Sequence, residues 1–322
     1  MVDKYLFING LQIRNKNYFP ILKVMKRSPL TQLLCILCMV SAQAQIEVTT
    51  RALLPPIIKE SSGLLLLDNQ LITHNDSGNS PLLYFLDTLE FNIQRSVKIL
   101  GVSNTDWEDL AADDQYIYVA DIGNNRGMRR DLKVLKIDKY DILNKDGVFP
   151  KTINFKYEDQ LNFEDTPNND WDAEALISWG DSLLIFSKQR QSGGAAVYAI
   201  PKTPGDYNAK KIRNFENIGL ITGATKSLTN SNITLVGYTN LLQPFLVTIP
   251  MEGKELEFPY QVHRQYLSVV TGQTEGVCSF PGNRIIISSE AFSNNWVNEA
   301  ASLFEVNLFP EDNTDHNQSE RK

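Results

Sequence analysis

Five short triplets decide the fold: Ser62-Gly63-Leu64, Glu108-Asp109-Leu110, Glu174-Ala175-Leu176, Thr222-Gly223-Ala224 and Glu275-Gly276-Val277. Each begins with a polar residue, continues with a small or acidic one and ends with an aliphatic or small one. Their first members are 46, 66, 48 and 53 residues apart. Each interval has room for about four strands, and a repeated unit of four strands is typical of a β-propeller blade.

The chain between the triplets consists of short β-rich runs separated by Asn, Asp, Gly and Pro clusters. No segment after residue 45 has the periodicity of a long amphipathic helix. We therefore predict an all-β fold, a β-propeller. The predicted strands include Leu64–Leu67, Leu82–Leu86, Tyr116–Ala120, Leu132–Ile137, Leu183–Ser187, Ala196–Ile200, Ile233–Tyr238, Phe245–Ile249, Arg284–Ser288 and Leu303–Leu308.

Five triplets predict five blades. The longest interval contains the Asn-, Asp- and Pro-rich stretch Phe163–Asp170, which we interpret as a loop; six blades would result if this interval held another blade. Only three strands fit between Glu275 and Pro310, so the last blade lacks a strand. We expect the segment Ile46–Ala52 to supply it, which closes the ring and covers an edge.

The N-terminal region has the pattern of an export signal. Met25-Lys26-Arg27 is basic, Leu30–Val40 is mostly apolar, and Ser41-Ala42-Gln43-Ala44 has the small-x-small pattern of a cleavage site. We interpret residues 1–44 as an upstream extension and signal peptide that starts at Met25; a retained anchor is the alternative. The predicted domain spans 45–310, with a disordered tail at 311–322. The protein would be exported to the periplasm, cell surface or medium.

The composition is that of a soluble domain and excludes several function classes. The net charge is −7 and the sequence pI about 5.1, with no basic stripe, so we expect no nucleic-acid partner. Cys278 is the single cysteine after the signal segment, so no internal disulfide is expected. We expect a monomer without a membrane span in the mature chain, and an extracellular ligand or small molecule as partner.

The first strand of each propeller blade lines the central channel, so the triplets predict a ring of polar side chains. It would contain Ser62, Glu108, Glu174, Thr222 and Glu275. Each carboxylate pair in such a ring repels by roughly 3 kcal/mol. Oxygen ligands without His or Cys favour a hard cation, and a roomy ring favours calcium, which we predict as a structural ion. Alternatively, these side chains bind backbone N–H groups or channel water.

Four further residues are candidates for catalysis: His74, Asp76, Lys188 and Arg190. His74 beside Asp76 is a pairing found in general base catalysis. The simpler interpretation is that His74–Asn79 is a turn whose side chains cap backbone groups. No Gly-x-Ser-x-Gly elbow, Walker loop or His/Cys metal cluster occurs in the sequence.

The order of Ser62-Gly63-Leu64, Trp107-Glu108, Ala173-Glu174-Ala175 and Glu275-Gly276 resembles the five-bladed calcium-activated nucleotidases, or soluble apyrases. That family holds a central calcium with Ser and Glu side chains at blade starts, so the resemblance implies the same here. The chain departs from the family where phosphates would be held. Asn75–Gly78 replaces a turn that carries Arg in the family, and Gly237-Tyr238 replaces a Lys; Lys188 and Arg190 alone lie in a comparable place.

A closer resemblance is to uncharacterised secreted bacterial β-propellers, some described as phytase-like esterases or SdiA-regulated proteins. It rests on four strings: Thr73–Asn79, Asp106–Ala111, Asp121–Asn125 and Asp172–Ala175. This resemblance implies the fold and export but no agreed activity.

Two functions remain open at this point. The first is an extracellular binding or interaction module of unknown ligand, with a structural calcium on the axis. The second is a calcium-dependent hydrolase of phosphate esters or nucleotides. Convergence of Lys188, Arg190, Arg126 and Arg129 over the calcium would favour the second, and scattered positions would favour the first.

Overall fold

The computed structural model describes residues 46–251, 257–259, 261–268, 273–293 and 298–308. The regular secondary structure of these ranges is almost wholly β, and the one helix within them is α2 (Lys139–Asn144). No helix in the described ranges is long and apolar enough to span a membrane. The predicted signal segment and tail lie outside these ranges, so the domain boundaries stay predictions.

Most strands form antiparallel meanders of four. The first comprises β2 (Ser61–Leu67), β3 (Gln70–Asn75), β4 (Leu82–Asp87) and β5 (Ile93–Ile99). The second comprises β6 (Trp107–Ala112), β7 (Tyr116–Asp121), β8 (Lys133–Asp138) and β10 (Lys151–Tyr157). The third comprises β11 (Ala173–Trp179), β12 (Ser182–Ser187), β13 (Ala195–Pro201) and β14 (Gly205–Phe215). The fourth comprises β15 (Leu220–Lys226), β16 (Ile233–Tyr238), β17 (Pro244–Ile249) and β18 (Arg264–Tyr266).

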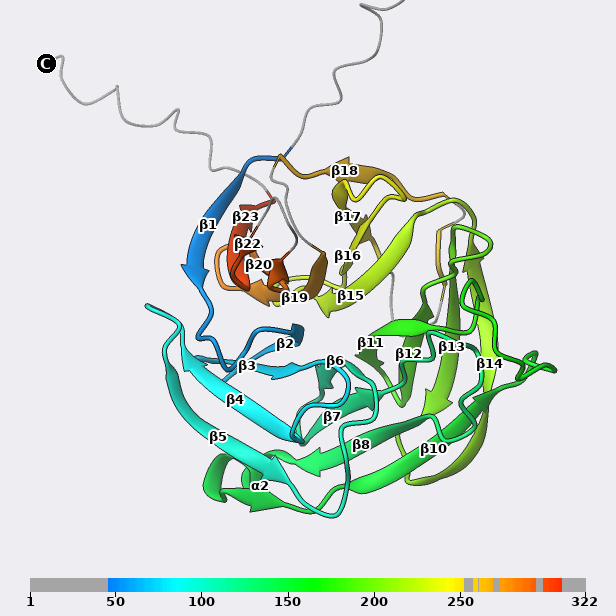
Figure 1. Ribbon diagram of the computed structural model, residues 1–322, viewed down its shortest axis with the longest axis horizontal. Helices are drawn as coiled ribbons and strands as arrows, with labels where there is room; N and C mark the ends of the chain where they lie inside the picture. Colours follow the sequence, from blue (N-terminus) through cyan, green and yellow to red (C-terminus); the bar gives the residue numbers. More distant parts are fainter. Residues whose placement is uncertain (1–45, 252–256, 260, 269–272, 294–297, 309–322) are drawn as a thin grey trace, which may run out of the picture. The chain divides into compact units, whose positions relative to one another are not determined.

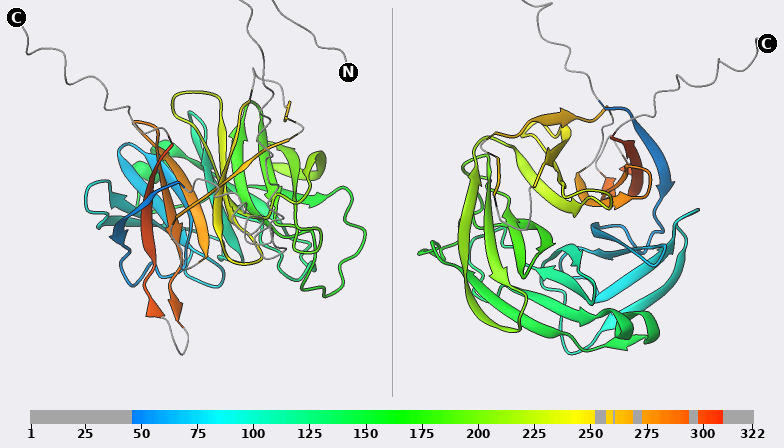
Figure 2. Two further views of the ribbon diagram at one scale, coloured as in Figure 1. Left: turned by 90° about the horizontal axis from the view of Figure 1, so that it is seen from above. Right: turned by 180° about the vertical axis from the view of Figure 1, so that it is seen from behind.

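The last meander is completed by the N-terminal strand. It contains β19 (Thr274–Phe280), β20 (Arg284–Ser289), β23 (Ser302–Asn307) and, paired antiparallel to β23, β1 (Val48–Leu53). A short hairpin of β21 (Phe292–Ser293) and β22 (Asn298–Glu299) projects from this meander (Figure 2). The prediction that Ile46–Ala52 supplies the missing strand is therefore confirmed.

The first strands of the meanders surround a common axis (Figure 1). In the described chain β2 lies against β6, β6 against β11, β11 against β15, β15 against β19, and β19 against β2. Apolar side chains fill the space between adjacent meanders, such as Tyr118, Tyr157 and Tyr198 between the second and third. The all-β propeller fold is confirmed, and each predicted strand overlaps an observed one.

Two parallel pairings join neighbouring meanders. β10 pairs with β14 from Ile153↔Gly205 to Tyr157↔Ala209, so the second and third meanders form one eight-stranded sheet. The short strand β9 (Gly147–Val148) pairs with β5 in the same manner. Because hydrogen bonds run across these boundaries, the sheets do not by themselves give the blade count, and five blades stays our prediction. Residues 158–172, which contain the predicted loop, include no strand.

Candidate functional site: an acidic cluster at one end of the axis

Each of the five inner strands carries a β-bulge at its triplet. The pairing shifts between Ser61 and Leu64, Trp107 and Asp109, Ala173 and Ala175, Ile221 and Gly223, and Thr274 and Val277. A bulge leaves its extra residue out of the strand ladder and re-aims the side chain. The five first members of the triplets thus occupy equivalent places in the fold.

The second residues of four triplets, Gly63, Asp109, Gly223 and Gly276, lie where the inner strands approach closely. A Cβ on Gly63 would overlap the backbone of Asp109 and Leu110, and one on Gly276 would overlap the carbonyl oxygen of Ser62. The fully buried Asp109 carboxylate accepts hydrogen bonds from backbone N–H groups of three strands, at Leu110 (2.8 Å), Leu176 (2.8 Å) and Ala224 (3.3 Å). Burial raises the pKa of Asp109 well above its usual value, although these donors oppose the shift.

The two hydroxyl members of the predicted ring tie adjacent inner strands together. Ser62 Oγ donates to the carbonyl oxygen of Glu108 (2.6 Å), and Thr222 Oγ1 donates to that of Thr274 (2.6 Å). Both side chains are buried. Each hydroxyl oxygen keeps lone pairs, so these bonds leave its predicted role as a ligand open.

Glu174 is held by two basic residues that follow β12. Lys188 Nζ lies 2.8 Å from its Oε1, and Arg190 lies 3.6 Å from the same atom. Burial alone would raise the pKa of Glu174, but Lys188 and Arg190 lower it below the usual value. Glu275, the third glutamate of the ring, has a pKa well above normal because burial outweighs the effect of nearby Lys188.

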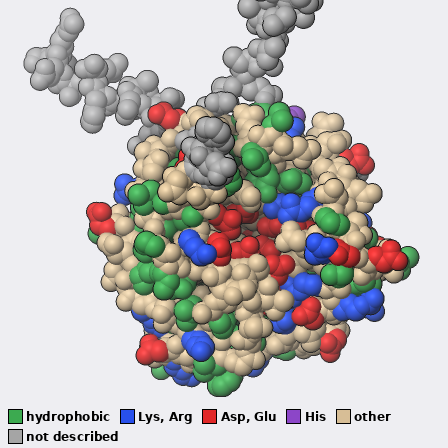
Figure 3. Space-filling view, in the orientation of Figure 1, with side chains coloured by type: hydrophobic (Ala, Val, Ile, Leu, Met, Phe, Trp, Pro, Cys, Tyr) green, Lys and Arg blue, Asp and Glu red, His purple; other side chains and the backbone are tan. Residues whose placement is uncertain are grey.

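Three aspartates extend the ring into a larger acidic cluster. Asp76, Asp106 and Glu108 offer carboxylate oxygens within 4.8 Å of one another, as do Glu108, Asp172 and Glu174. Figure 3 shows Asp and Glu side chains gathered at the centre of this face, over the inner strands. Glu108 belongs to both groups, so it is the centre of the cluster.

Asp106 and Asp172 are functional candidates that we did not derive from the sequence. Each stands two residues before an axial glutamate, as Asp106-x-Glu108 and Asp172-x-Glu174. This shared spacing could have identified them. Asp76, which the sequence predicts as a catalytic candidate, lies with Asp106 and Glu108 in one of the two carboxylate groups.

The motif residues around the cluster fix the positions of the aspartates. The Asn104 amide donates to the carbonyl oxygens of Asn75 (2.9 Å) and Asp76 (2.8 Å), and its own oxygen accepts from the Trp107 backbone N–H (3.1 Å). The Asp172 carboxylate accepts from the backbone N–H of Asn124 (2.8 Å). The Asn104 side chain and the Asn124 backbone thus hold the segments that carry Asp76 and Asp172.

The string Asp121–Asn125 contains Gly123 for a steric reason. A Cβ at this position would overlap the carboxylates of Glu108 and Asp106. Arg129 donates to the Gly123 carbonyl oxygen (2.8 Å) and to Asp121 (2.8 Å), which holds the loop beneath the cluster. The site therefore needs glycine there for space rather than for backbone flexibility.

The crowded carboxyl groups have raised pKa values. Burial, then Glu174, raises the pKa of Asp76 to about 6; burial, then Asp76, raises that of Asp106 to about 7. Burial and Glu174 raise that of Asp172 to about 6, and the same two causes lift that of Glu108 well above normal. Without a bound cation, several of these groups share protons near neutral pH.

The structure places His74 in the core. Its ring is fully buried and packs edge-on against Trp107, with ring centroids 5.7 Å apart. Nδ1 donates to the carbonyl oxygen of Asn75 (3.0 Å). Burial lowers the pKa of His74 to about 4, so the ring is neutral at pH 7.

Each of the four basic residues considered for phosphate binding contacts a carboxylate. Lys188 pairs with Glu174, and Arg190 lies 3.1 Å from Asp172. Arg129 pairs with Asp121, and Arg126 forms an exposed ion pair with Asp165. Lys188 and Arg190 adjoin the acidic cluster, whereas Arg126 and Arg129 pair with carboxylates outside its two metal-ligand groups.

The melting temperature in chelator is expected to fall by several degrees as pH rises from about 5 to about 8. A carboxyl group whose folded pKa is raised stabilises the fold below its unfolded pKa, and this stabilisation is lost as pH rises through the folded pKa. For Asp106 this window runs from 3.8 to about 7. Calorimetry in EGTA measures the fall, which Asp106→Asn should flatten. A melting temperature that rises over this range would contradict the raised pKa values.

No protein-family model matches this sequence, and no curated protein matches it. Solved structures that match include the PQQ-bound aldose sugar dehydrogenase from Streptomyces coelicolor (11% identity, TM-score 0.45, covering 80% of this chain and 98% of that one). They also include glutaminyl cyclase from Myxococcus xanthus (13%, 0.47, 82% and 97%) and an α-L-arabinofuranosidase from Podospora anserina (10%, 0.47, 83% and 97%). Similarity at this level assigns no activity. The resemblances to apyrases and to secreted bacterial propellers rest on short motifs and stay predictions.

Proposed function

We propose that this protein is a secreted β-propeller that binds calcium in the acidic cluster and serves as an extracellular binding module. The observation that carries the proposal is the group of Asp76, Asp106 and Glu108, whose oxygens lie within 4.8 Å of one another. The charges of Asp172 and Glu174 are offset by ion pairs with Arg190 and Lys188. By contrast, the group of Asp76, Asp106 and Glu108 has no ion pair among the described residues.

Electrostatics favours a cation in this group. Two full charges at such a separation repel by roughly 3 kcal/mol at an effective dielectric constant of about 20. Burial, and then the charges of neighbouring carboxylates that include Glu174, raise the pKa values of Asp76, Asp106 and Glu108. A divalent ion would displace the shared protons and convert the repulsion into attraction.

The donor chemistry favours calcium. The cluster offers carboxylate oxygens only, which suits hard cations rather than zinc or copper. Calcium takes six to eight oxygens at flexible angles, whereas magnesium demands a near-ideal octahedron. Asp172 and water could supply the remaining ligands of the ion. The other members of the predicted ring, Ser62, Glu174, Thr222 and Glu275, remain candidate ligands.

A binding role is favoured because Lys188 and Arg190, the basic residues of the cluster, already pair with its carboxylates. Phosphate esters and anhydrides need cationic groups to hold their oxygens. Arg190 is the observation in favour of the alternative, a calcium-dependent hydrolase, because its side chain is 25% exposed beside Asp172 and Glu174. Export, a monomeric state and the absence of nucleic-acid partners belong to the proposal on the sequence arguments given above.

A hydrolase panel tests which function is right. The purified protein is incubated with p-nitrophenyl phosphate and with ATP, in calcium and in EGTA, beside an Arg190→Ala variant. We expect phosphate release equal to the protein-free blank in every condition. Calcium-dependent release that Arg190→Ala abolishes would establish the hydrolase instead.

A further inference from the structure

The propeller axis is closed between its two ends. The backbones of the inner strands touch at the second triplet positions, where a Cβ on Gly223 would overlap the carbonyl oxygen of Glu275 and one on Gly63 would overlap Asp109. The buried Asp109 carboxylate bridges three of these strands at the same level. In the acidic cluster, Glu108 and Glu174 are first members of their triplets, Asp106 and Asp172 precede them, and Asp76 directly follows the antiparallel neighbour strand β3. The third members of the triplets and the residues after them line a separate opening at the other end.

That opening holds a cavity of about 480 Å³, which we call the distal funnel. Its wall contains residues from all five inner strands. Its buried lining includes Leu64, Leu110, Leu176, Ala224 and Cys278, which belong to the cores between the meanders. The accessible apolar lining is formed by the half-buried Leu65, Leu66 and Ala112 and by Leu228, which is 56% exposed at the mouth. A cavity of this size that combines apolar and polar groups is typical of a small-molecule site.

Lysines surround the mouth of the distal funnel. Lys139, Lys202 and Lys226 line it, together with Asp113 and Asp114. Lys202 is 3.2 Å from Asp113, whereas Lys139 and Lys226 form no ion pair with any residue that the structure describes. The ammonium of Lys226 lies 4.8 Å from the Trp179 ring centroid. With three lysines and two aspartates, this mouth has a small net positive charge in a chain of net charge −7.

We propose that the distal funnel binds a small organic carboxylate with an apolar chain, such as a medium-chain fatty acid. The apolar chain would lie against Leu65, Leu66 and Leu228, and the carboxylate would lie among Lys139 and Lys226 at the mouth. These lysines select an anion, and the accessible leucines select an alkyl or aryl body over a compact ion such as phosphate.

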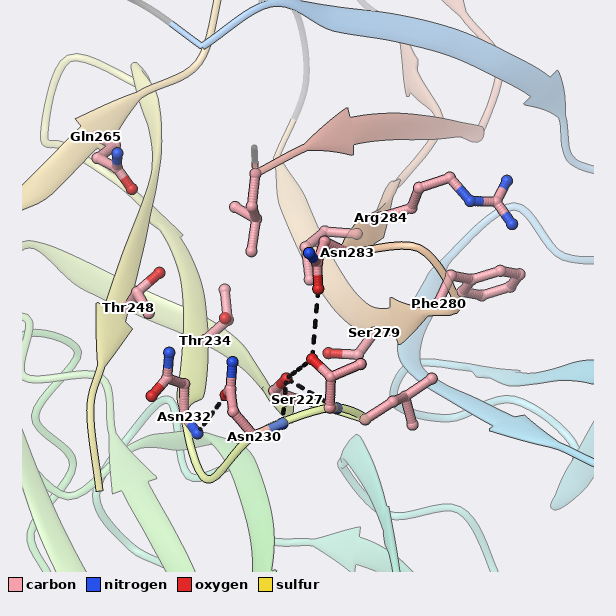
Figure 4. A pocket seen from close by; sticks show the side chains of 14 residues that line it. Ser227, Asn230, Asn232, Thr234, Thr248, Gln265, Ser279, Phe280, Asn283 and Arg284 are labelled. Carbon is pink, nitrogen blue, oxygen red and sulfur yellow. Dashed lines mark hydrogen bonds between the residues drawn. The ribbon is translucent and has the colours of Figure 1, made fainter. Parts of the chain in front are cut away.

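A smaller neighbouring cavity of about 140 Å³ has different chemistry (Figure 4). Amides and hydroxyls of the β15–β16 loop and the β19–β20 turn face one another there, and Thr229 donates to Asn283 (3.3 Å). It contains no lysine, and Arg284 beside it lies 3.4 Å from Glu305. The proposal is therefore confined to the distal funnel.

Isothermal titration calorimetry with octanoate tests the proposal. Octan-1-ol has the same chain length without the charge, and acetate has the charge without the chain. All titrations contain EGTA, which keeps the cation site out of the measurement. We expect octanoate to bind with one site per chain and octan-1-ol to bind about fivefold more weakly, the factor of a solvent-exposed ion pair. Acetate should bind more weakly still, because it lacks the alkyl chain that would be buried. Equal affinity for octanoate and octan-1-ol, or no octanoate binding at millimolar concentration, would overturn the proposal.

Variants locate the binding. Lys226→Gln removes one charge at the mouth and should weaken octanoate about fivefold, whereas the exposed Lys98, outside the funnel, serves as the matched control through Lys98→Gln. Ala112→Phe fills space in the half-buried wall and should abolish binding. If Ala112→Phe fails to fold, the comparison of Lys226→Gln with Lys98→Gln still decides whether octanoate binds in the distal funnel. Octanoate affinity that is unchanged in Lys226→Gln, or equally reduced in Lys98→Gln, would show that the funnel is not the site.

Discussion

Removal of residues 45–53 is expected to abolish cooperative melting and to cause aggregation. These residues contain β1, which is the outermost strand of the last meander and pairs with β23 from Val48↔Val306 to Leu53↔Ser302. Ile46 also donates its backbone N–H to the carbonyl oxygen of Tyr266 (2.8 Å) and so joins the fourth meander to the fifth. Without this segment the ring is open and β23 exposes its edge, a site for association with other chains.

The deletion is tested by comparing chains that begin at residue 45 and at residue 54, by calorimetry and light scattering. Thr49→Ala is the matched control, because Thr49 is exposed and the substitution keeps the strand backbone. A peptide of residues 45–54 added in trans should restore a melting transition by adding a strand to β23. A truncated chain that melts at the full-length temperature would show that β1 does not hold the ring closed.

Replacement of Lys188 by Met is expected to lower the free energy of unfolding by about 3–5 kcal/mol, as is usual when one partner of a buried ion pair is removed. Lys188 and Glu174 are 2.8 Å apart, with side chains 3% and 6% exposed. Lys188 also offsets the charge of Glu275, and its ammonium lies 5.2 Å from the Tyr238 ring centroid. Methionine has similar length but leaves both glutamates without this cation.

Denaturant unfolding at pH 7 in EGTA measures the loss. The double variant Lys188→Met/Glu174→Gln should recover a large part of it, because it removes the uncompensated charge as well. Lys98→Gln, at an exposed site, should change stability by less than about 0.5 kcal/mol. If Lys188→Met unfolds at the wild-type denaturant concentration, the buried pair does not organise the cluster as described.

The fold was largely predictable from the sequence because one geometric constraint repeats. The inner strands must approach one another closely round an axis, and this close approach requires Gly63, Gly223 and Gly276. Each of these strands also carries a bulge that leaves a polar side chain just before the point where the strands touch. The strand deficit after Glu275 also predicted correctly that β1 joins the last meander. The parallel pairing of β10 with β14 could not be predicted, because nothing in either strand's own pattern specifies a partner across a blade boundary.

The candidate site was predictable only in part. The triplets identified Glu108 and Glu174, whose bulges share one pattern, but Asp106 and Asp172 precede the strands in loops where acidic residues are common. Asp76 and Lys188 each follow a second strand directly, at equivalent places. Which carboxylate Lys188 neutralises depends on distances round the ring, and a linear sequence does not contain those distances.

The most direct test of the cation proposal is calorimetric melting of the wild type and Glu108→Gln, each in millimolar calcium and in EGTA. Calcium at a hundred times its dissociation constant would add roughly 2.7 kcal/mol, or a few degrees in a domain of this size. Glu108 belongs to both carboxylate groups, so Glu108→Gln should melt higher than the wild type in EGTA and respond less to calcium. Glu216→Gln, at an exposed position, should behave as the wild type does. A wild-type melting temperature that is the same in calcium and in EGTA would contradict the account.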